Sequence, residues 1–381
     1  MEFTQFFNPV SIPNTYLGNP EKMGSAIRCF SPSDTDWRSA DIILLGCEKD
    51  RNCSTRLADV VRAELYNLSL PATHLKIMDM GNLIFQDTKE ESSETLGFVL
   101  ERMIRAGKIG IVLGMSREIA YGQTLAYRYA SDTPADLDGQ HIEYVYVSSA
   151  LDMTDTQISK EEESVNYRIF NQFPPRVNGL TGIGMQKYRL TQAEIQLMQN
   201  LNFSILRYGE IAGNITAVEP YFREAQAVCI DMSSVRHSDS PGSNRPSPGG
   251  FSVMEICRIA RFAGASTVNT LSITETNPME DIHNQTTMLS AMLIWYFCEG
   301  FYTKVQENPQ THSAHFKTYR VQLNASVDEI VFYQSNLTER WWMEVKNHPR
   351  KKIVPCTEAE YLCASKNEIP DRWWQIFNRL A

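Results

Sequence analysis

The sequence lacks a hydrophobic run long enough to cross a lipid bilayer. The longest apolar run, residues 288–297, is interrupted by Ser290 and is typical of a buried helix. The first ten residues also lack the basic stretch followed by an apolar stretch that a secretory signal requires. These two absences predict a cytoplasmic protein with no membrane partner.

Paired cysteines are absent as well, because none of the eight cysteines forms a CxxC motif. Several of them, such as Cys229 and Cys257, lie within apolar runs. In a chain of 381 residues this pattern is typical of reduced core cysteines rather than of a disulfide framework or a zinc site.

The chain has no excess of positive charge. The 36 lysines and arginines stand against 45 aspartates and glutamates, which gives a formal net charge of −9 and does not favour a nucleic-acid partner. No GxGxxG or P-loop motif supports nucleotide binding. The composition, 43% apolar and 21% charged, is that of an ordinary globular protein and argues against intrinsic disorder.

Short apolar runs alternate with helical patterns up to about residue 302. The run IILLG at 42–46 predicts a buried strand, and residues 57–65 then repeat leucine and valine at helical spacing. Further strands are predicted at 76–80, 108–113, 144–148, 181–185, 204–207, 227–231 and 267–273, and helices at 93–105 and 116–129 and from about 191, 252 and 281. Continuous apolar strands separated by helices predict a three-layer α/β/α fold with a mostly parallel sheet.

The character of the sequence changes after about Tyr302. Residues 321–323 and 329–333 are typical of paired strands around a turn at 324–328, and four of the six tryptophans follow in the pairs 341–342 and 373–374. We therefore predict an α/β domain over residues 1–302. Residues 303–381, the C-terminal appendage, are expected to pack on the main sheet or on a partner.

Functional groups in open parallel sheets collect where strands end at their carboxyl termini. Four such strand ends carry polar residues, and their sequences can be compared. They read LGMSREIAYG at 113–122, VSSALD at 147–152, CIDMS at 229–233 and ETNPMED at 275–281.

In this order these four segments resemble the motifs of the arginase (ureohydrolase) family, over about residues 41–301. The ending EIAYG makes the formimidoylglutamase branch the most similar one. Pro-Gly at 241–242 and SPGG at 247–250 also resemble the family's loop after the third motif. The resemblance implies an arginase-like fold and a homo-oligomer.

The family hydrolyses a guanidino or formimino carbon with a water shared by two Mn²⁺ ions, held by two histidines and four aspartates. By this resemblance only Asp152 and Asp231 keep a ligand position. Arginine, which cannot coordinate a metal, stands at the first histidine position. The vestigial cleft therefore consists of Arg117, Glu118, Ser148, Ala150, Asp152, Asp231, Ser233 and Glu275. We expect no metal, no cofactor and no catalytic residue in it.

The nearest histidines do not supply the missing metal ligands, and the segment 161–168 does not supply the branch's substrate-recognition stretch. His141 and His237 are expected to be surface or loop histidines. The branch's glutamate-recognition stretch, roughly SGTPF, has no counterpart in EEESVNYR at 161–168, where 161–163 predict a solvated acidic loop. Asn166 and Arg168 are left as residues that could still bind a ligand.

Three functions follow from these residues. The preferred one is a family member without the binuclear manganese site or hydrolase activity, acting as a structural or interaction protein through a protein partner or self-association. The second is a metal-dependent hydrolase of C–N bonds in formimino or guanidino compounds, with an altered manganese site on Asp152, Asp231 and Glu275. The third is a small-molecule sensor that uses the old cleft.

Without metal ions, three carboxylates in one cleft would repel each other. A guanidinium is a fixed positive charge that can pair bidentately with a carboxylate. We therefore predict that Arg117 pairs with Asp152 or Asp231, the alternative being that it turns to solvent.

Overall fold

A computed structural model describes residues 3–10, 19–31, 33–47, 57–84, 88–130, 142–153, 164–170, 177–323 and 329–380. The predictions for His141, for the loop 161–163 and for the turn at 324–328 lie outside these residues. None of the described helices is long and apolar enough to cross a membrane.

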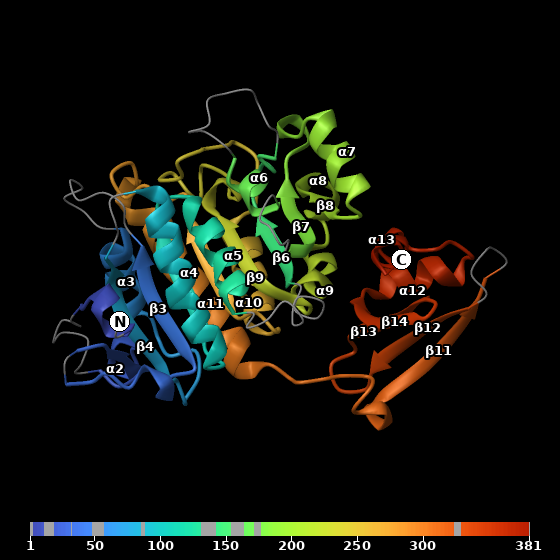
Figure 1. The fold of residues 1–381 in the computed structure, drawn as a ribbon, viewed down its shortest axis with the longest axis horizontal. Helices are drawn as coiled ribbons and strands as arrows, with labels where there is room; N and C mark the ends of the chain where they lie inside the picture. The colour runs from blue at the N-terminus through green and yellow to red at the C-terminus, as the bar shows by residue number, and fades with distance from the viewer. Residues whose placement is uncertain are drawn as a thin grey trace.

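One large sheet forms the centre of the molecule (Figure 1). Its strands are β1 (Phe7–Asn8), β2 (Ile27–Cys29), β3 (Ile42–Cys47), β4 (Ile77–Leu83), β5 (Ile109–Gly114), β6 (Ile142–Val147), β7 (Val177–Met185), β8 (Ser204–Arg207), β9 (Ala225–Asp231) and β10 (Thr270–Thr274). The order is β1-β4-β3-β5-β10-β9-β6-β7-β8, with β2 beside β4, and only the short β1 pairs in the antiparallel sense. The prediction of a mostly parallel sheet is confirmed.

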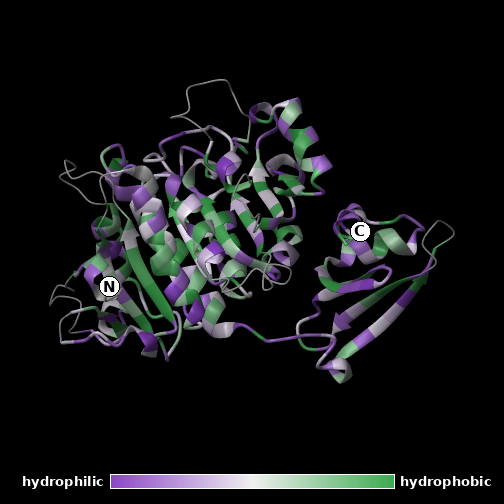
Figure 2. Ribbon diagram, viewed as in Figure 1, coloured by the Kyte–Doolittle hydropathy of each residue, from purple (hydrophilic) through white to green (hydrophobic). Residues whose placement is uncertain are grey.

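Helices cover both faces of this sheet. They are α2 (Met23–Ala26), α3 (Leu57–Asn67), α4 (Lys89–Arg105), α5 (Glu118–Tyr129), α6 (Val165–Phe170), α7 (Gln192–Asn200), α8 (Tyr208–Ile211), α9 (Glu219–Phe222), α10 (Val253–Gly264) and α11 (Gln285–Thr303). In β3, Ile42 and Leu44 join the core under α3, α10 and α11, whereas Ile43 and Leu45 join the core under α4 and α5. This alternation, expected of a strand buried on both faces, confirms the three-layer arrangement. Figure 2 shows strands of the large sheet mostly in green, for hydrophobic residues, and flanking helices in which green and purple, for hydrophilic residues, are mixed.

A second, antiparallel sheet follows in the appendage. It consists of β11 (Phe316–Gln322), β12 (Glu329–Ser335), β13 (Trp341–Asn347) and β14 (Arg350–Cys356), and α12 (Glu358–Ser365) and α13 (Asp371–Arg379) come after it. The predicted pairing of the first two strands is confirmed, with Val321 opposite Ile330. The division at residue 302 stays a prediction, and α11 extends one residue beyond it.

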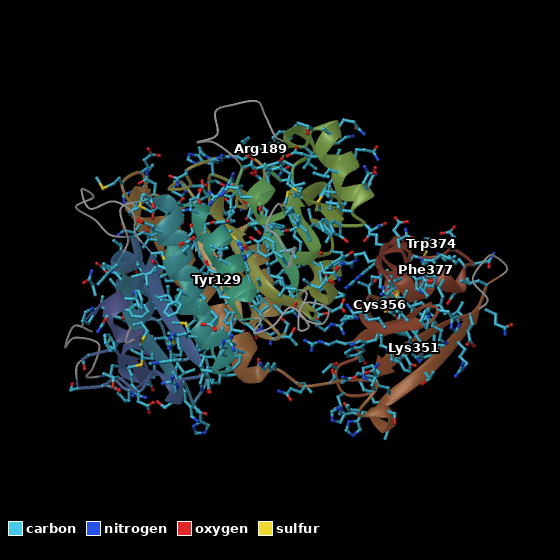
Figure 3. The ribbon with its side chains drawn as sticks, in the orientation of Figure 1. Tyr129, Arg189, Lys351, Cys356, Trp374 and Phe377 are labelled. Carbon is cyan, nitrogen blue, oxygen red and sulfur yellow. The ribbon has the colours of Figure 1, made fainter. Side chains whose placement is uncertain are left out.

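The tryptophans of the appendage build a core of their own. Trp341 and Trp373 are buried there together with Phe332 and Met343. On α13, Trp374 meets Phe377 with their rings 5.6 Å apart (Figure 3). Because most of these aromatics face inward, they stabilise the appendage itself.

The appendage packs on the main domain at the amino ends of the large sheet's strands. Arg379 of α13 pairs with Glu143, the second residue of β6, at 3.0 Å. Lys352 and Arg372 both pair with Glu224, just before β9, at 2.9 and 3.4 Å. The appendage therefore lies at the edge opposite to the carboxyl ends of the strands.

Candidate functional site

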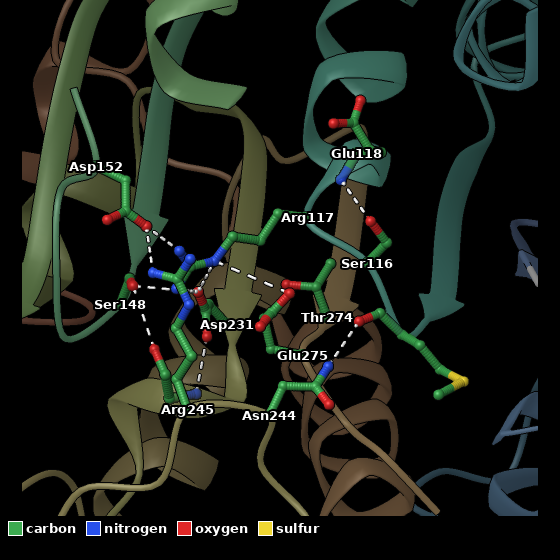
Figure 4. A network of polar contacts seen from close by, with 12 residues as sticks. Ser116, Arg117, Glu118, Ser148, Asp152, Asp231, Asn244, Arg245, Thr274 and Glu275 are labelled. Carbon is green, nitrogen blue, oxygen red and sulfur yellow. Dashed lines mark hydrogen bonds and ion pairs between the residues drawn. The ribbon is translucent and has the colours of Figure 1, made fainter. Parts of the chain in front are cut away.

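The four strand ends singled out in the sequence meet at one edge of the large sheet. Strands β5, β10, β9 and β6 are consecutive parallel neighbours, so their carboxyl ends lie side by side. Arg117 follows β5, Asp152 follows β6, Asp231 ends β9 and Glu275 follows β10. Figure 4 shows these side chains directed toward one another.

Arg117 lies at the centre of this cluster. Its Nε donates a hydrogen bond to Asp231 Oδ2 at 2.8 Å, and its Nη2 lies 2.6 Å from the same oxygen. Its Nη1 donates to Asp152 Oδ2, and its Nε is 4.0 Å from Glu275 Oε1. The side chain is 10% exposed. The pairing predicted for Arg117 is therefore present, with both aspartates at once.

The backbone before Arg117 needs a glycine. A Cβ on Gly114, the last residue of β5, would come within 2.5 Å of the Cys47 carbonyl oxygen on the neighbouring strand. Because glycine permits this close approach, the chain can bend at the edge of the sheet and place Arg117 in the cluster before α5 begins.

Asp231 is fully buried and accepts several hydrogen bonds besides those of Arg117. The hydroxyls of Tyr146 and Ser148 donate to its Oδ2 at 3.0 and 3.2 Å, and the backbone N–H of Ser233 donates to its Oδ1 at 2.8 Å. Its carboxylate is thus held by donors on both oxygens, which keeps a buried charge stable.

The charges in the cluster shift each other's proton affinity. Burial raises the pKa of Glu275, and Asp231 raises it further, while Arg117 and Arg245 oppose this in part. Burial alone would lower the pKa of Arg117, but Tyr146, Asp231 and Glu275 outweigh it, so its pKa rises. Arg117 is therefore a permanent cation among three carboxyl groups.

Two members of this cluster were missed in the sequence. Tyr146 lies one residue before the end of β6, and its alternation with Val145 and Val147 along the strand is the signal that could have found it. Arg245 donates from its Nη1 to Asp152 Oδ2 at 2.8 Å. It lies in a loop, where no periodicity reveals the direction of a side chain.

Asp152 and Glu275 both have left-handed backbones, with φ of 51° and 65°. Such values are uncommon for residues other than glycine and persist where the surroundings impose them, often at functional sites. Both carboxylates are thus presented from left-handed loop backbones that the surrounding cluster holds in place.

Other residues predicted for the cleft take structural roles. Glu118 points away from the cluster (Figure 4) and pairs with Arg168 at 2.8 Å. Ala150 is buried, and its N–H donates to Ser148 Oγ at 3.4 Å. Asn166 donates to the carbonyl of Leu151. One donor group of Asn166 and one of Arg168 are thus engaged with the protein itself, while the Asn166 Oδ1 is buried with no hydrogen-bond partner among the described residues. His237 is exposed, as predicted.

Asp281, the last residue of the motif at 275–281, also has a structural role. The Asp281 carboxylate accepts the backbone N–H groups of Thr286 and Thr287 at 2.8 and 2.7 Å, at the start of α11. A side-chain carboxylate at a helix start satisfies N–H groups that have no partner inside the helix. Asp281 therefore caps a helix and contributes nothing to the cluster.

The described residues contain no group of three or more His, Cys, Asp or Glu side chains arranged to hold a metal ion. Three carboxylates are present at the strand ends, but the Arg117 guanidinium lies between them and no imidazole joins them. This donor set does not fit a binuclear manganese centre, which needs imidazole and oxygen ligands around an unobstructed space.

Comparisons with known proteins agree with the fold and the motifs. The model of the Arginase family matches residues 43–299. The formimidoylglutamase of Geobacillus kaustophilus (strain HTA426) is 25% identical over 225 residues, which cover 56% of this chain and 67% of that protein. The formimidoylglutamase of Staphylococcus carnosus (strain TM300) is 23% identical over 258 residues, covering 63% and 77%.

Solved structures show the same fold. The formiminoglutamase of Trypanosoma cruzi with Mn²⁺ is 21% identical, has a TM-score of 0.61 and is matched over 97% of its length and 72% of this chain. The formimidoylglutamase of Bacillus subtilis is 16% identical, with a TM-score of 0.62, over 93% of its length and 75% of this chain. The family model ends at residue 299, before the appendage begins.

Proposed function

Because the chain belongs to the arginase family and is most similar to formimidoylglutamases, we propose that it has lost the binuclear manganese site and the hydrolase activity. It acts instead as a structural or interaction protein. Its partner is another protein or a second copy of the chain.

The observation that carries this proposal is the position of the Arg117 guanidinium. It is buried and bonded to Asp152 and Asp231, the two residues left at ligand positions. A guanidinium has no lone pair to give to a metal, and its charge repels a dication at the same place.

The chemistry of hydrolysis depends on what the metal ions supply. A pair of bound Mn²⁺ ions lowers the pKa of a bridging water and stabilises the transition state. In this chain Asp231 is instead saturated by Arg117, Tyr146 and Ser148. The cluster ties the ends of four strands together, which supports a structural role.

A metal-dependent hydrolase with an altered site is the second candidate. One observation favours it: Asp152, Asp231 and Glu275 still surround a single point, with Arg117 between them. If the Arg117 side chain rotated out of the cluster, these three carboxylates would become available to bind a metal ion.

An activity assay separates the two candidates. The purified chain is incubated with added Mn²⁺ and formimidoylglutamate, arginine, agmatine or guanidinobutyrate, and release of formamide or urea is measured. We expect none above a blank without protein. Manganese-dependent release that disappears in Asp231→Asn would support the altered hydrolase and contradict our proposal.

A further inference from the structure

A pocket of about 230 Å³ lies where the appendage meets the main domain. Arg223 and Thr267, which precede β9 and β10, form one wall, and Lys304 to Glu307, after α11, form another. Arg340, Trp342 and Pro355 of the appendage close it. The pocket lies at the amino ends of the strands, opposite to the Arg117 cluster. Figure 1 shows the segment after α11 that connects the main domain to the appendage.

Arg223 is held in this wall by the appendage and by Glu219. Its Nη2 donates to the carbonyl oxygens of Trp341 and Cys356 at 3.0 and 3.2 Å, and its guanidinium lies 4.4 Å from the ring centre of Trp342. Its Nε is 3.1 Å from the Glu219 carboxylate. Both its Nη1 and its Nε are buried and have no hydrogen-bond partner among the described residues, although Nε forms the ion pair with Glu219. A buried charged donor without a partner is rare and points to an absent acceptor.

The acidic groups nearby are already engaged. Glu219 serves both Arg223 and Arg340, each at 3.1 Å. Glu307 accepts hydrogen bonds from the hydroxyls of Ser335 and Thr338. The carboxylates of Glu219 and Glu307 are thus already paired or hydrogen-bonded, and Asp41 is the acidic group whose charge acts on Lys304.

Burial acts on the charged side chains of both Lys304 and Arg223. Lys304 is half-buried, and its ammonium group lies 4.2 Å from the ring centre of Phe301. Burial lowers its pKa, and Asp41 opposes this in part. Burial also lowers the pKa of Arg223; Glu219 opposes this, while Arg340 and Arg372 lower the pKa further. A bound anion would stabilise the charged form of both groups.

We propose that this pocket binds a small organic anion through a phosphate or carboxylate group placed among Arg223, Lys304 and Arg340. Its apolar part lies against Trp342 and Pro355. A few convergent charged groups beside an apolar wall are typical of small-molecule sites, and the volume suits a compact ligand. The anion site is formed only when the appendage is docked. The proposal does not depend on whether the manganese site is lost.

The test is isothermal titration calorimetry of the full chain at physiological salt, with phenyl phosphate, benzoate and inorganic phosphate as probes. We expect saturable binding of one phenyl phosphate per chain and weaker binding of inorganic phosphate, which has no apolar part. Lys304→Met and Arg340→Gln each remove one cation, so the affinity should fall about tenfold or more.

The matched control is Lys366→Met, which removes an exposed lysine of the appendage. It should leave the affinity unchanged, and melting curves without ligand should show that all three variants are folded. If Lys304→Met melts lower, Lys304→Gln takes its place. No saturable binding of any probe, or equal losses in Lys366→Met and Lys304→Met, would overturn the proposal.

Discussion

Arg117 joins two carboxylates that come from different strand ends and lies near a third. The side chain is 10% exposed, so the charges it neutralises are largely removed from water. Removal of either partner would leave a buried, unpaired charge, so the loss of one partner should destabilise the fold strongly.

Arg117→Ala should therefore lower the free energy of unfolding by about 3–5 kcal/mol, measured by urea denaturation. Arg245→Ala is the matched control, since Arg245 contacts the same Asp152 oxygen but its side chain is 47% exposed. Its loss should amount to about 1 kcal/mol or less. Equal effects of the two substitutions would show that Arg117 is not part of a buried network.

Arg117→His should not restore manganese-dependent hydrolysis. Ser148, Ala150 and Ser233 still occupy ligand positions in that variant, so the site remains short of donors. Formamide or urea release after addition of Mn²⁺ is the readout, and turnover in this single variant would mean that the other ligand positions matter less than we infer.

Among the helices and strands, the sequence could reveal those site residues that directly follow a strand. The apolar runs predicted where β5, β9 and β10 end. Because parallel strands end at the same edge of a sheet, this placed Arg117, Asp231 and Glu275 together. Arg245 could not be predicted, because its contact with Asp152 spans 93 residues and starts from a loop. Boundaries also moved by a few residues, as in β10, which begins at Thr270 rather than at 267.

On β13, the buried Glu344 carboxylate lies 2.5 Å from the ammonium groups of both Lys346 and Lys351. Burial tends to raise its pKa, but the two lysines lower it by more, so the folded pKa lies below the ordinary glutamate value. The carboxylate thus contributes stability above its unfolded pKa, and this contribution is lost as the pH falls through the folded pKa.

Glu344→Gln should accordingly lower the melting temperature at neutral pH, by the equivalent of about 1 kcal/mol or less because the lysines are about half exposed. The difference from the parent should shrink on acidification. Glu280→Gln, at an exposed position, should show no such pH-dependent difference. A constant difference at all pH values would contradict the assigned role of the carboxylate.

At the scale of the whole molecule, the two cores of the large sheet lie within residues 7–298, and the appendage has a separate core within 323–376. The sequence predicted the separate appendage from its tryptophans and paired strands. It could not predict where the appendage docks, because contacts such as Arg379 with Glu143 join residues 236 positions apart. A homo-oligomer and a cytoplasmic location stay predictions.

Removal of residues 304–381 should leave a soluble, cooperatively folding main domain that has lost its partner or its assembly state. The cut keeps Tyr302, whose hydroxyl accepts the backbone N–H of Lys76 at 2.7 Å. Thermal melting and light scattering, compared with the full chain, provide the readout. An insoluble product would show that the appendage is required for folding and is not an interaction module.

Elemental analysis for manganese distinguishes a lost metal site from an intact one. The full chain is purified with added Mn²⁺, dialysed against metal-free buffer and analysed beside a formimidoylglutamase treated in the same way. Because Arg117 occupies the space among the remaining carboxylates, we predict far less than one manganese ion per chain. About two tightly held ions per chain, the content expected of an intact binuclear site, would contradict the account.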